Sequence, residues 1–338
     1  MRLENVLALT HGSLVNEPFV KLFTNVVYEA KAVKRGDLFM AFDESTIEDA
    51  IFNGAYGIVF SKPTQISDSE IAWIKVQSID DALKRLLRFK LIDKDIKVYQ
   101  TNEIVLKLAL QVVTEPSFIA IEGNIREISK QLWDVEESTV VLFCPTLADK
   151  NIFTNIIELS DSNNAHIDII EQTLFETSFI YDDIFYERQL LSPFFIPFLE
   201  ILLQLFKNLK INYRLRKFTP IDHFEAVFTN KRFEIKEFGT SDKVLIFERN
   251  SSLIESEIHF LKNEATWAKI LYVLPSLDET LIQKIPNNGD VVTYKSPNNI
   301  INLLREKDFH FALIIGASKE ILNRPIVSQA PVSLFDFD

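Results

Sequence analysis

The stretch FIAIEGNIREISK, residues 118–130, indicates the fold of the chain most directly. An apolar, strand-like run leads through Gly123 into a helical segment, which is the strand–loop–helix context of a P-loop. A working P-loop needs glycines that let backbone N–H groups converge on phosphate, a Lys for the β/γ oxygens, and a Ser or Thr for Mg²⁺. Arg126, Glu127 and Ile128 stand at the positions of the second glycine, the Lys and the first hydroxyl. Because a carboxylate repels a triphosphate, we expect this loop to bind no nucleotide.

Glycine usage supports the loss of nucleotide-binding motifs across the whole chain. There are only 8 glycines in 338 residues, where average usage of about 7% would give roughly three times as many. No two glycines are spaced as G-x-G, and none is followed by Lys. A dinucleotide fingerprint and an intact P-loop are both absent, so the sequence predicts no nucleotide cofactor. The degenerate loop itself consists of Gly123, Asn124, Arg126, Glu127 and Ser129.

The composition is that of a globular protein, since 47% apolar and 12% aromatic residues are ample for buried cores. The net charge of -12 argues against a nucleic acid or an anionic membrane as the main partner, although residues 207–217 form one local basic cluster near a helix end. The single cysteine, Cys144, lies in an apolar strand-like run and is expected to be a buried, inert thiol. The apolar stretch 194–206 is too short to span a bilayer, and the N-terminus lacks a signal-like apolar run, so we expect a cytoplasmic protein without a membrane span.

Alternating strand-like and helix-like segments predict an α/β protein of three domains. Residues 1–97 form a compact α/β unit in which Ser78 is expected to cap a helix. Residues 98–218 contain the degenerate loop and then a part that we expect to be helix-rich, ending in an apolar helix. Residues 219–325 alternate again, which implies a parallel or mixed sheet, and 326–338 form a flexible tail.

The segment FTNVVYEAKAVKRGDLFMA, residues 23–41, resembles the N-terminal domain of the Mur ligases, and within that family the branch that adds D-alanyl-D-alanine to a UDP-muramoyl tripeptide. The G-D-L-F match is the specific part of the resemblance. In the family this domain holds the uridine nucleotide, with the Ser and Arg of a D-S-R triplet near the ligand, whereas residues 29–31 here are Glu-Ala-Lys. The expected contacts of any retained UDP-sugar are Glu29, Ala30, Lys31, Gly36 and Asp37.

The resemblance continues to the end of the chain. The apolar residues of the family's motifs are kept, whereas their polar residues are replaced. The loop at Gly123 stands where the family has G-[ST]-x-G-K-[ST], and the next hundred residues resemble a contracted ATPase domain. Phe247–Ser252 replaces a D-x-Y-N-A-N-P stretch, and Ile315–Lys319 replaces a near-terminal K-G-S-R. Family ligases use ATP and Mg²⁺ to form an acyl-phosphate that an amino acid or dipeptide attacks. The resemblance therefore implies a three-domain Mur-ligase-like architecture with a contracted central domain that lacks a working P-loop.

Two further side-chain patterns resemble chemical sites but have simpler interpretations. His166 and Asp168 have the spacing of a metal-ligand pair, but a surface loop explains them better. Asp182 and Asp183 with Glu187 could pair carboxylates, because positions four apart share a helix face, but their aromatic neighbours indicate an amphipathic helix with an acidic outer face. The sequence thus predicts no catalytic residue and no metal ligand.

The C-terminal tail carries the pattern of a short linear motif. Leu334 and Phe335 are apolar anchors flanked by acidic residues, a pattern that suits insertion into a partner's groove. A frayed chain end is the simpler interpretation.

Taken together, these patterns favour a catalytically degenerate Mur-ligase-like protein that acts as a binding, regulatory or scaffold partner of enzymes in cytoplasmic peptidoglycan precursor synthesis. One alternative is a divergent, active ATP-dependent UDP-muramoyl-peptide ligase whose phosphate contacts come from other residues, such as Arg126 or Lys130. A second alternative is an interaction module that works through its C-terminal Leu-Phe peptide, residues 333–338.

Overall fold

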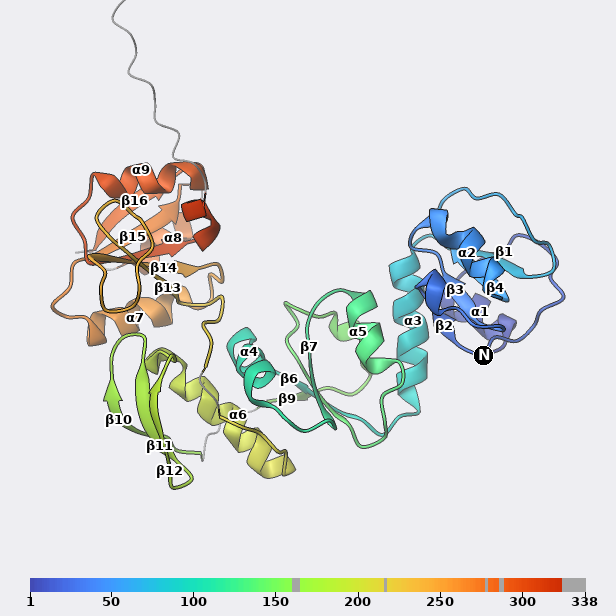
Figure 1. Ribbon diagram of the computed structural model, residues 1–338, viewed down its shortest axis with the longest axis horizontal. Helices are drawn as coiled ribbons and strands as arrows, with labels where there is room; N and C mark the ends of the chain where they lie inside the picture. The colour runs from blue at the N-terminus through green and yellow to red at the C-terminus, as the bar shows by residue number, and fades with distance from the viewer. Residues whose placement is uncertain (160–164, 216–217, 277–278, 286–288, 324–338) are drawn as a thin grey trace, which may run out of the picture. The chain divides into compact units, whose positions relative to one another are not determined.

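The computed structural model describes residues 1–159, 165–215, 218–276, 279–285 and 289–323 (Figure 1). The chain forms two compact units, Met1–Asn163 with Ile201–Arg214, and Asn164–Glu200 with Leu215–Asp338. Both units combine helices with β-sheets, which confirms the α/β class. The alternation of strand-like and helix-like segments therefore predicted the fold class correctly.

The N-terminal part of the first unit is a five-stranded sheet with the order β1-β5-β4-β3-β2. Strands β2 to β5 run parallel, and β1 pairs antiparallel with β5. Ser78 caps α3 by accepting a hydrogen bond from the Asp81 N–H at 3.2 Å, as predicted. The elements are α1 (Leu3–Thr10), β1 (Ser13–Leu14), β2 (Val26–Val27), β3 (Leu38–Met40), α2 (Ile47–Phe52), β4 (Gly57–Phe60), β5 (Ala72–Lys75) and α3 (Ile79–Ile92).

The central part of the first unit is a four-stranded parallel sheet with the order β7-β8-β6-β9. Its β7 strand leads directly into α5, which confirms the strand–loop–helix pattern of residues 118–130. Helix α3 packs against both α1 and α5 and so joins the two sheets of this unit. The elements are β6 (Lys97–Gln100), α4 (Glu103–Val112), β7 (Phe118–Ile121), α5 (Ile125–Leu132), β8 (Val140–Phe143) and β9 (Ile157–Glu158).

The second unit begins with a three-stranded antiparallel sheet, where the sequence led us to expect helix. Its strands are β10 (Asp168–Gln172), β11 (Thr177–Tyr181) and β12 (Ile184–Gln189). Asp182 and Asp183 form the tight turn between β11 and β12, and both have positive φ, 52° and 61°. Such a pair of left-handed residues is typical of the two-residue turn that matches strand twist. The expected acidic helix face at 182–187 is therefore wrong, because β-branched and aromatic residues around an Asp-Asp turn favour a hairpin.

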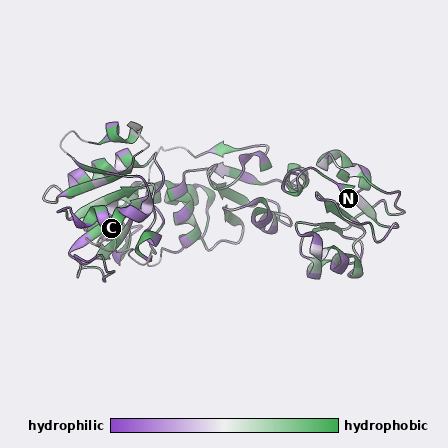
Figure 2. Ribbon diagram, turned by 90° about the horizontal axis from the view of Figure 1, so that it is seen from above, coloured by the Kyte–Doolittle hydropathy of each residue, from purple (hydrophilic) through white to green (hydrophobic). Residues whose placement is uncertain are grey.

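The remainder of the second unit is a five-stranded sheet with the order β13-β14-β17-β15-β16, in which only β13 is antiparallel to its neighbour. Strands β14, β15 and β17 are nearly continuous apolar runs, as expected of parallel strands covered on both faces. Figure 2 shows hydrophobic residues in green throughout the part of the chain near the label C. The elements are α6 (Ile196–Leu209), which begins in this unit, β13 (Glu225–Thr229), β14 (Lys243–Glu248), α7 (Ile254–Glu264), β15 (Ile270–Pro275), α8 (Glu279–Lys284), β16 (Asp290–Tyr294), α9 (Ile300–Arg305) and β17 (Phe311–Ile315).

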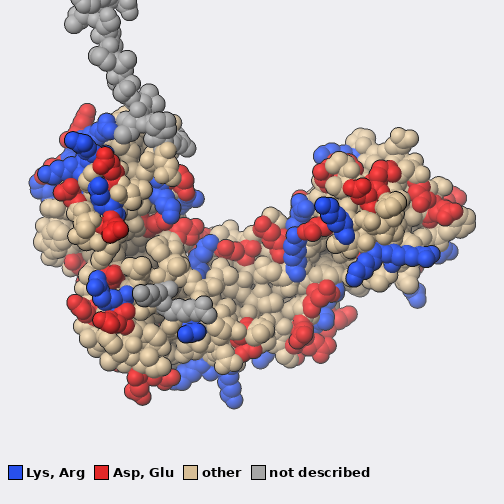
Figure 3. Space-filling model, in the orientation of Figure 1, with Lys and Arg blue, Asp and Glu red and all other residues tan. Residues whose placement is uncertain are grey.

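Short 3-10 helices lie at Ala30–Ala32, Glu44–Thr46, Lys150–Ile152, Pro193–Phe195, Pro297–Asn299 and Lys319–Asn323. Within the part of the chain that the structure describes, no helix has the length and apolar character needed to cross a membrane. On the face seen in Figure 3, acidic and basic side chains are interspersed.

Candidate functional site

The N-terminus of α5, where a P-loop would hold phosphate, is closed by the chain's own groups. The Gly123 N–H donates to the Leu147 carbonyl at 3.0 Å. The Asn124 side-chain oxygen accepts from the N–H groups of Arg126 and Glu127 at 3.0 and 3.1 Å. In return, the Glu127 carboxylate accepts from the Asn124 N–H at 3.0 Å, which completes a capping box. These N–H groups, which would otherwise be available to a phosphate, are already hydrogen-bonded.

The Glu127 carboxylate lies directly over the one glycine of this loop. Gly123 has φ +108°, a conformation that L side chains rarely adopt, and a Cβ added there would overlap Oε2 of Glu127. Because a helix N-terminus attracts negative charge, the Glu127 carboxylate supplies the anion that the site favours. Gly123 therefore makes room for a side chain of this chain, in the place where a P-loop glycine makes room for phosphate.

The basic residues of α5 contact the N-terminal sheet region. The Arg126 guanidinium lies 4.4 Å from the centre of the Phe42 ring, within range of a cation–π interaction. The Lys130 ammonium lies 2.5 Å from Oε1 of Glu29, and this hydrogen bond lowers the pKa of Glu29. Ser129 is fully buried. The structure thus pairs Glu29 with Lys130, two residues that the sequence had assigned to separate candidate sites.

The N-terminal residues that match the family pattern have structural roles here. Ala30 is buried and begins a 3-10 helix, while Lys31 is exposed. Gly36 has φ +99°, and the buried Asp37 accepts a hydrogen bond from the Lys34 N–H at 2.9 Å, which closes the turn before β3. An open cavity of about 350 Å³ lies beside this segment, with Glu29 in its wall. The Gly36-Asp37 pair, which matches the family pattern, therefore has a structural role in the turn before β3.

The two altered C-terminal segments meet at the end of the sheet, since Glu248 on β14 pairs with Ile315 on β17. The Glu248 carboxylate is fully buried and accepts from the Asn250 N–H at 2.6 Å, with His223 Nδ1 at 3.0 Å on the same oxygen. Burial acts to raise the pKa of Glu248, but hydrogen bonds, with that of His223 the strongest, lower it overall. Glu248 is therefore a well-satisfied, ionised group inside the fold.

Glu257 on α7 is a second buried acid, and it interacts with Glu248. Its protonated carboxyl group hydrogen-bonds to the Glu248 carboxylate, and no other described residue is a hydrogen-bond partner of its side chain. Burial, followed by the negative charge of Glu248, raises the pKa of Glu257 well above its ordinary value. Glu257 therefore keeps its proton at pH values where an exposed Glu has lost it.

The other candidates of the sequence are unremarkable or lie outside the described residues. His166 is exposed, 3.3 Å from Asp168, and no group of three His, Cys, Asp or Glu in the described ranges could hold a metal ion. Cys144 is buried, as predicted. Leu334 and Phe335 lie in 324–338, outside the residues that the structure describes. Residues 216–217 of the basic cluster also lie outside the described residues.

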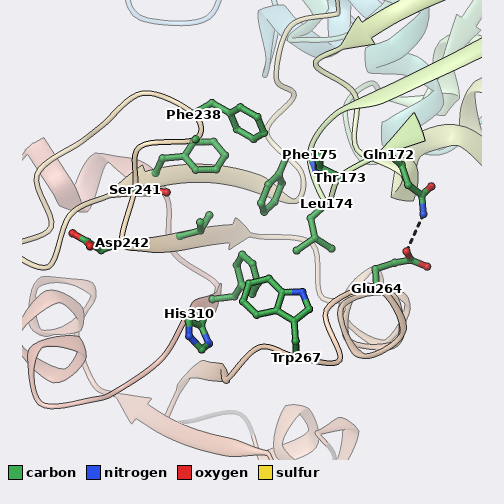
Figure 4. Close-up of a pocket in the computed structure, with 14 residues that line it drawn as sticks. Gln172, Thr173, Leu174, Phe175, Phe238, Ser241, Asp242, Glu264, Trp267 and His310 are labelled. Atoms are coloured by element: carbon green, nitrogen blue, oxygen red, sulfur yellow. Dashed lines mark hydrogen bonds between the residues drawn. The ribbon is translucent and has the colours of Figure 1, made fainter. Parts of the chain in front are cut away.

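A pocket of about 610 Å³ in the second unit was not foreseen from the sequence (Figure 4). We call it the aromatic pocket. It is lined by Gln172, Thr173, Leu174, Phe175, Phe228, Phe238, Gly239, Ser241, Asp242, Val244, Glu264, Trp267, His310 and Phe311. This volume is within the range of small-molecule sites.

The loop between β10 and β11 builds one wall of the aromatic pocket. Thr173 closes this loop by accepting, through Oγ1, the N–H groups of Phe175 and Glu176 at 3.2 and 3.0 Å. Phe175, at the loop tip, meets Phe228 and Phe311 with ring centroids 5.4 and 6.2 Å apart, both edge to face. Such pairs add to the stability gained by burial. Phe175 thereby fixes the three-stranded sheet to the larger sheet of the same unit.

Trp267, between α7 and β15, forms another wall and is 69% exposed. Its ring lies 5.8 Å from that of Phe311 and 5.4 Å from that of His310. His310 Nδ1 accepts the Lys269 N–H at 2.9 Å, so the neutral ring carries its proton on Nε2. No local sequence pattern predicted the aromatic pocket, because its rings come from segments that are distant in the sequence. The signal in the sequence was Trp267, a tryptophan in a loop.

Comparison with known proteins gives a fold match without a sequence match. No protein-family model matches the chain, and no curated protein matches it. MurF from Acinetobacter baumannii is similar over 96% of this chain and 99% of its own, with a TM-score of 0.51 at 9% identity. MurF ligase from Thermotoga maritima, solved in complex with ADP, is similar over 88% and 94%, with a TM-score of 0.48 at 14% identity. The chain has the multidomain α/β fold of the Mur ligases.

Proposed function

We propose that this chain is a catalytically degenerate Mur-ligase-like protein that has lost ATP-driven ligation. It acts as a binding, regulatory or scaffold partner in cytoplasmic peptidoglycan precursor synthesis. The observation that carries the loss of ligation is the capping box of α5, in which Asn124 and Glu127 use the N–H groups that a phosphate would need.

Electrostatics opposes ATP at this loop more strongly than the cap does. Breaking the cap costs about 1 kcal/mol. Each unit charge of a triphosphate placed about 4 Å from the Glu127 carboxylate is repelled by about 4 kcal/mol at a near-surface effective dielectric. The charge of Glu127 therefore dominates, and restoring a free helix N-terminus alone does not restore binding.

The competing proposal, a divergent active ligase, needs cations that reach the phosphates. Its two candidates have other contacts, Arg126 with the Phe42 ring and Lys130 with Glu29. Replacing both by Ala tests this alternative. Any ATP-dependent ligation that persists unchanged in the double variant excludes these residues as the phosphate contacts.

A thermal-shift panel tests the proposal, because a ligand that binds only the folded state raises its stability. We expect no shift of the unfolding midpoint with ATP and Mg²⁺. UDP and a UDP-muramoyl tripeptide are the parallel arms, and a shift with either indicates that the N-terminal segment at 29–37 still binds a nucleotide-sugar. A shift with ATP, or dipeptide ligation onto the UDP-muramoyl peptide, contradicts the proposal.

The partner role is tested separately with purified enzymes of peptidoglycan precursor synthesis. The full chain and a variant lacking residues 333–338 are each used as bait for those enzymes. Binding by both variants supports the scaffold role of the folded units. Binding that the deletion abolishes assigns the interaction to the C-terminal Leu-Phe peptide.

A further inference from the structure

We propose that the aromatic pocket of the second unit binds a cationic group, an ammonium or guanidinium on a short apolar stem. This proposal goes beyond the loss of ligation and does not depend on it, since the loop at Gly123 lies in the first unit.

The shape and lining of the pocket suit a ligand with an apolar body. Ring contacts run without a break from Phe238 through Phe228 and Phe175 to Phe311, and then to Trp267, with centroids 5.0 to 6.2 Å apart. Trp267 presents most of its surface to solvent beside this row of rings (Figure 4). Large aromatic side chains left exposed around a hollow mark a binding surface.

The charged residues around the pocket favour a ligand with a positive charge. Asp242 and Glu264 line it, and none of the described residues in its wall is Lys or Arg. A phosphate or carboxylate ligand would therefore meet two like charges without a counter-ion. Asp242 and Glu264 lie at opposite ends of the pocket in Figure 4, so a cation beside Trp267 gains mainly from the Glu264 carboxylate and from the aromatic faces, whose quadrupoles attract positive charge.

Glu264 is placed where an acid is unfavourable for the helix itself. It is the last residue of the 11-residue α7, and the C-terminal end of a helix carries partial negative charge. At the edge of the pocket the carboxylate accepts a hydrogen bond from the Gln172 side chain, whose Nε2 donates to its Oε2 at 2.9 Å (Figure 4). The helix end and the carboxylate together form a negative region beside Trp267, which suits a cation.

The test uses n-butylguanidinium against two probes with the same stem, butan-1-ol and pentanoate, at fixed ionic strength. Trp267 reports binding in the full chain. The chain has three tryptophans, and the other two, Trp73 and Trp133, are only 0% and 8% exposed. We expect a saturable fluorescence change with the cation, and an affinity at least 10-fold above those of the neutral and anionic probes. No saturable change, or equal binding of butan-1-ol or pentanoate, overturns the proposal.

Variants assign the binding to the pocket. Glu264→Gln is expected to weaken n-butylguanidinium binding at least 5-fold, whereas Glu255→Gln, exposed in the first turn of the same helix, leaves it unchanged. Trp267→Ala should abolish binding as seen by saturation-transfer NMR of the ligand, which needs no indole. An unchanged unfolding midpoint shows that each variant is folded. Equal effects of the two Glu variants, or binding retained by Trp267→Ala, contradict the assignment.

Discussion

The loop at Gly123 and the aromatic pocket differ in whether their groups already have partners within the chain or are exposed to a ligand. At the loop, strand and helix present backbone donors as a phosphate site would, and Asn124 and Glu127 then take them up. At the pocket, no motif signals a site, yet rings from distant segments surround a cavity of about 610 Å³ with an exposed Trp267. At the loop the chain's own side chains occupy the backbone donors, whereas at the pocket an aromatic side chain stays exposed beside a cavity.

The largest expected effect concerns the wall of the pocket. Phe175→Ala removes a half-buried ring that meets three others, Phe224, Phe228 and Phe311. We expect the second unit to lose about 2–4 kcal/mol of unfolding free energy, measured by urea titration. The matched control is Phe185→Ala, since Phe185 is 52% exposed on β12. Equal losses in the two variants would show that packing at Phe175 does not build the pocket.

The next effect contrasts Glu127, an exposed carboxylate in a capping box, with Glu257, a buried acid beside the carboxylate of Glu248. Because the folded-state pKa of Glu257 is raised, the folded chain holds a proton that the unfolded chain releases above about pH 4.5. Stability from this group is therefore lost as pH rises toward the folded-state pKa. We expect Glu257→Gln to raise the unfolding free energy by about 1–3 kcal/mol at pH 8, and by less at pH 5.

Thermal and urea unfolding between pH 5 and 8 measure this difference. A gain for Glu257→Gln that is independent of pH would show that the carboxyl does not titrate in the folded chain. Glu127→Gln serves as the contrasting variant, since it keeps a side-chain acceptor in the capping box but removes the negative charge at the N-terminus of α5, and it is expected to lower stability.

A smaller effect concerns the cap of α5. Asn124→Ala removes the acceptor of two N–H groups, and we expect a loss of about 1 kcal/mol in unfolding free energy. Asn124→Asp keeps an acceptor and should differ from the native chain by only a few tenths of that loss. If Asn124→Ala is as stable as the native chain, the loop is not held closed by its cap.

The smallest effect is expected at Lys130, whose contact with Glu29 is solvent-exposed on both sides. Lys130→Ala should shift the unfolding midpoint by less than Asn124→Ala does, and the shift should shrink further in high salt. A larger shift would mean that this ion pair, and not the packing of α3 and α5, joins the two sheets of the first unit.

Sequence patterns predicted the parts of the structure that depend on residues a few positions apart. The β7–α5 pattern, the Ser78 cap and the alternation of the C-terminal sheet follow from apolar period and capping residues within a few positions. The β10–β12 sheet was missed because the four-residue spacing of Asp183 and Glu187 also fits a helix face, although the residues around them favour strands. The aromatic pocket was missed because Phe175, Trp267 and Phe311 meet only through tertiary packing.

The most direct test of the central claim is an amide NMR titration of the full chain with ATP and Mg²⁺, followed at Gly123, Asn124, Arg126 and Glu127. Because their N–H groups already have partners within the chain, we predict that these resonances stay in place up to millimolar ATP. A saturable shift of these same resonances would contradict the account, since it would show that the loop still opens to hold phosphate.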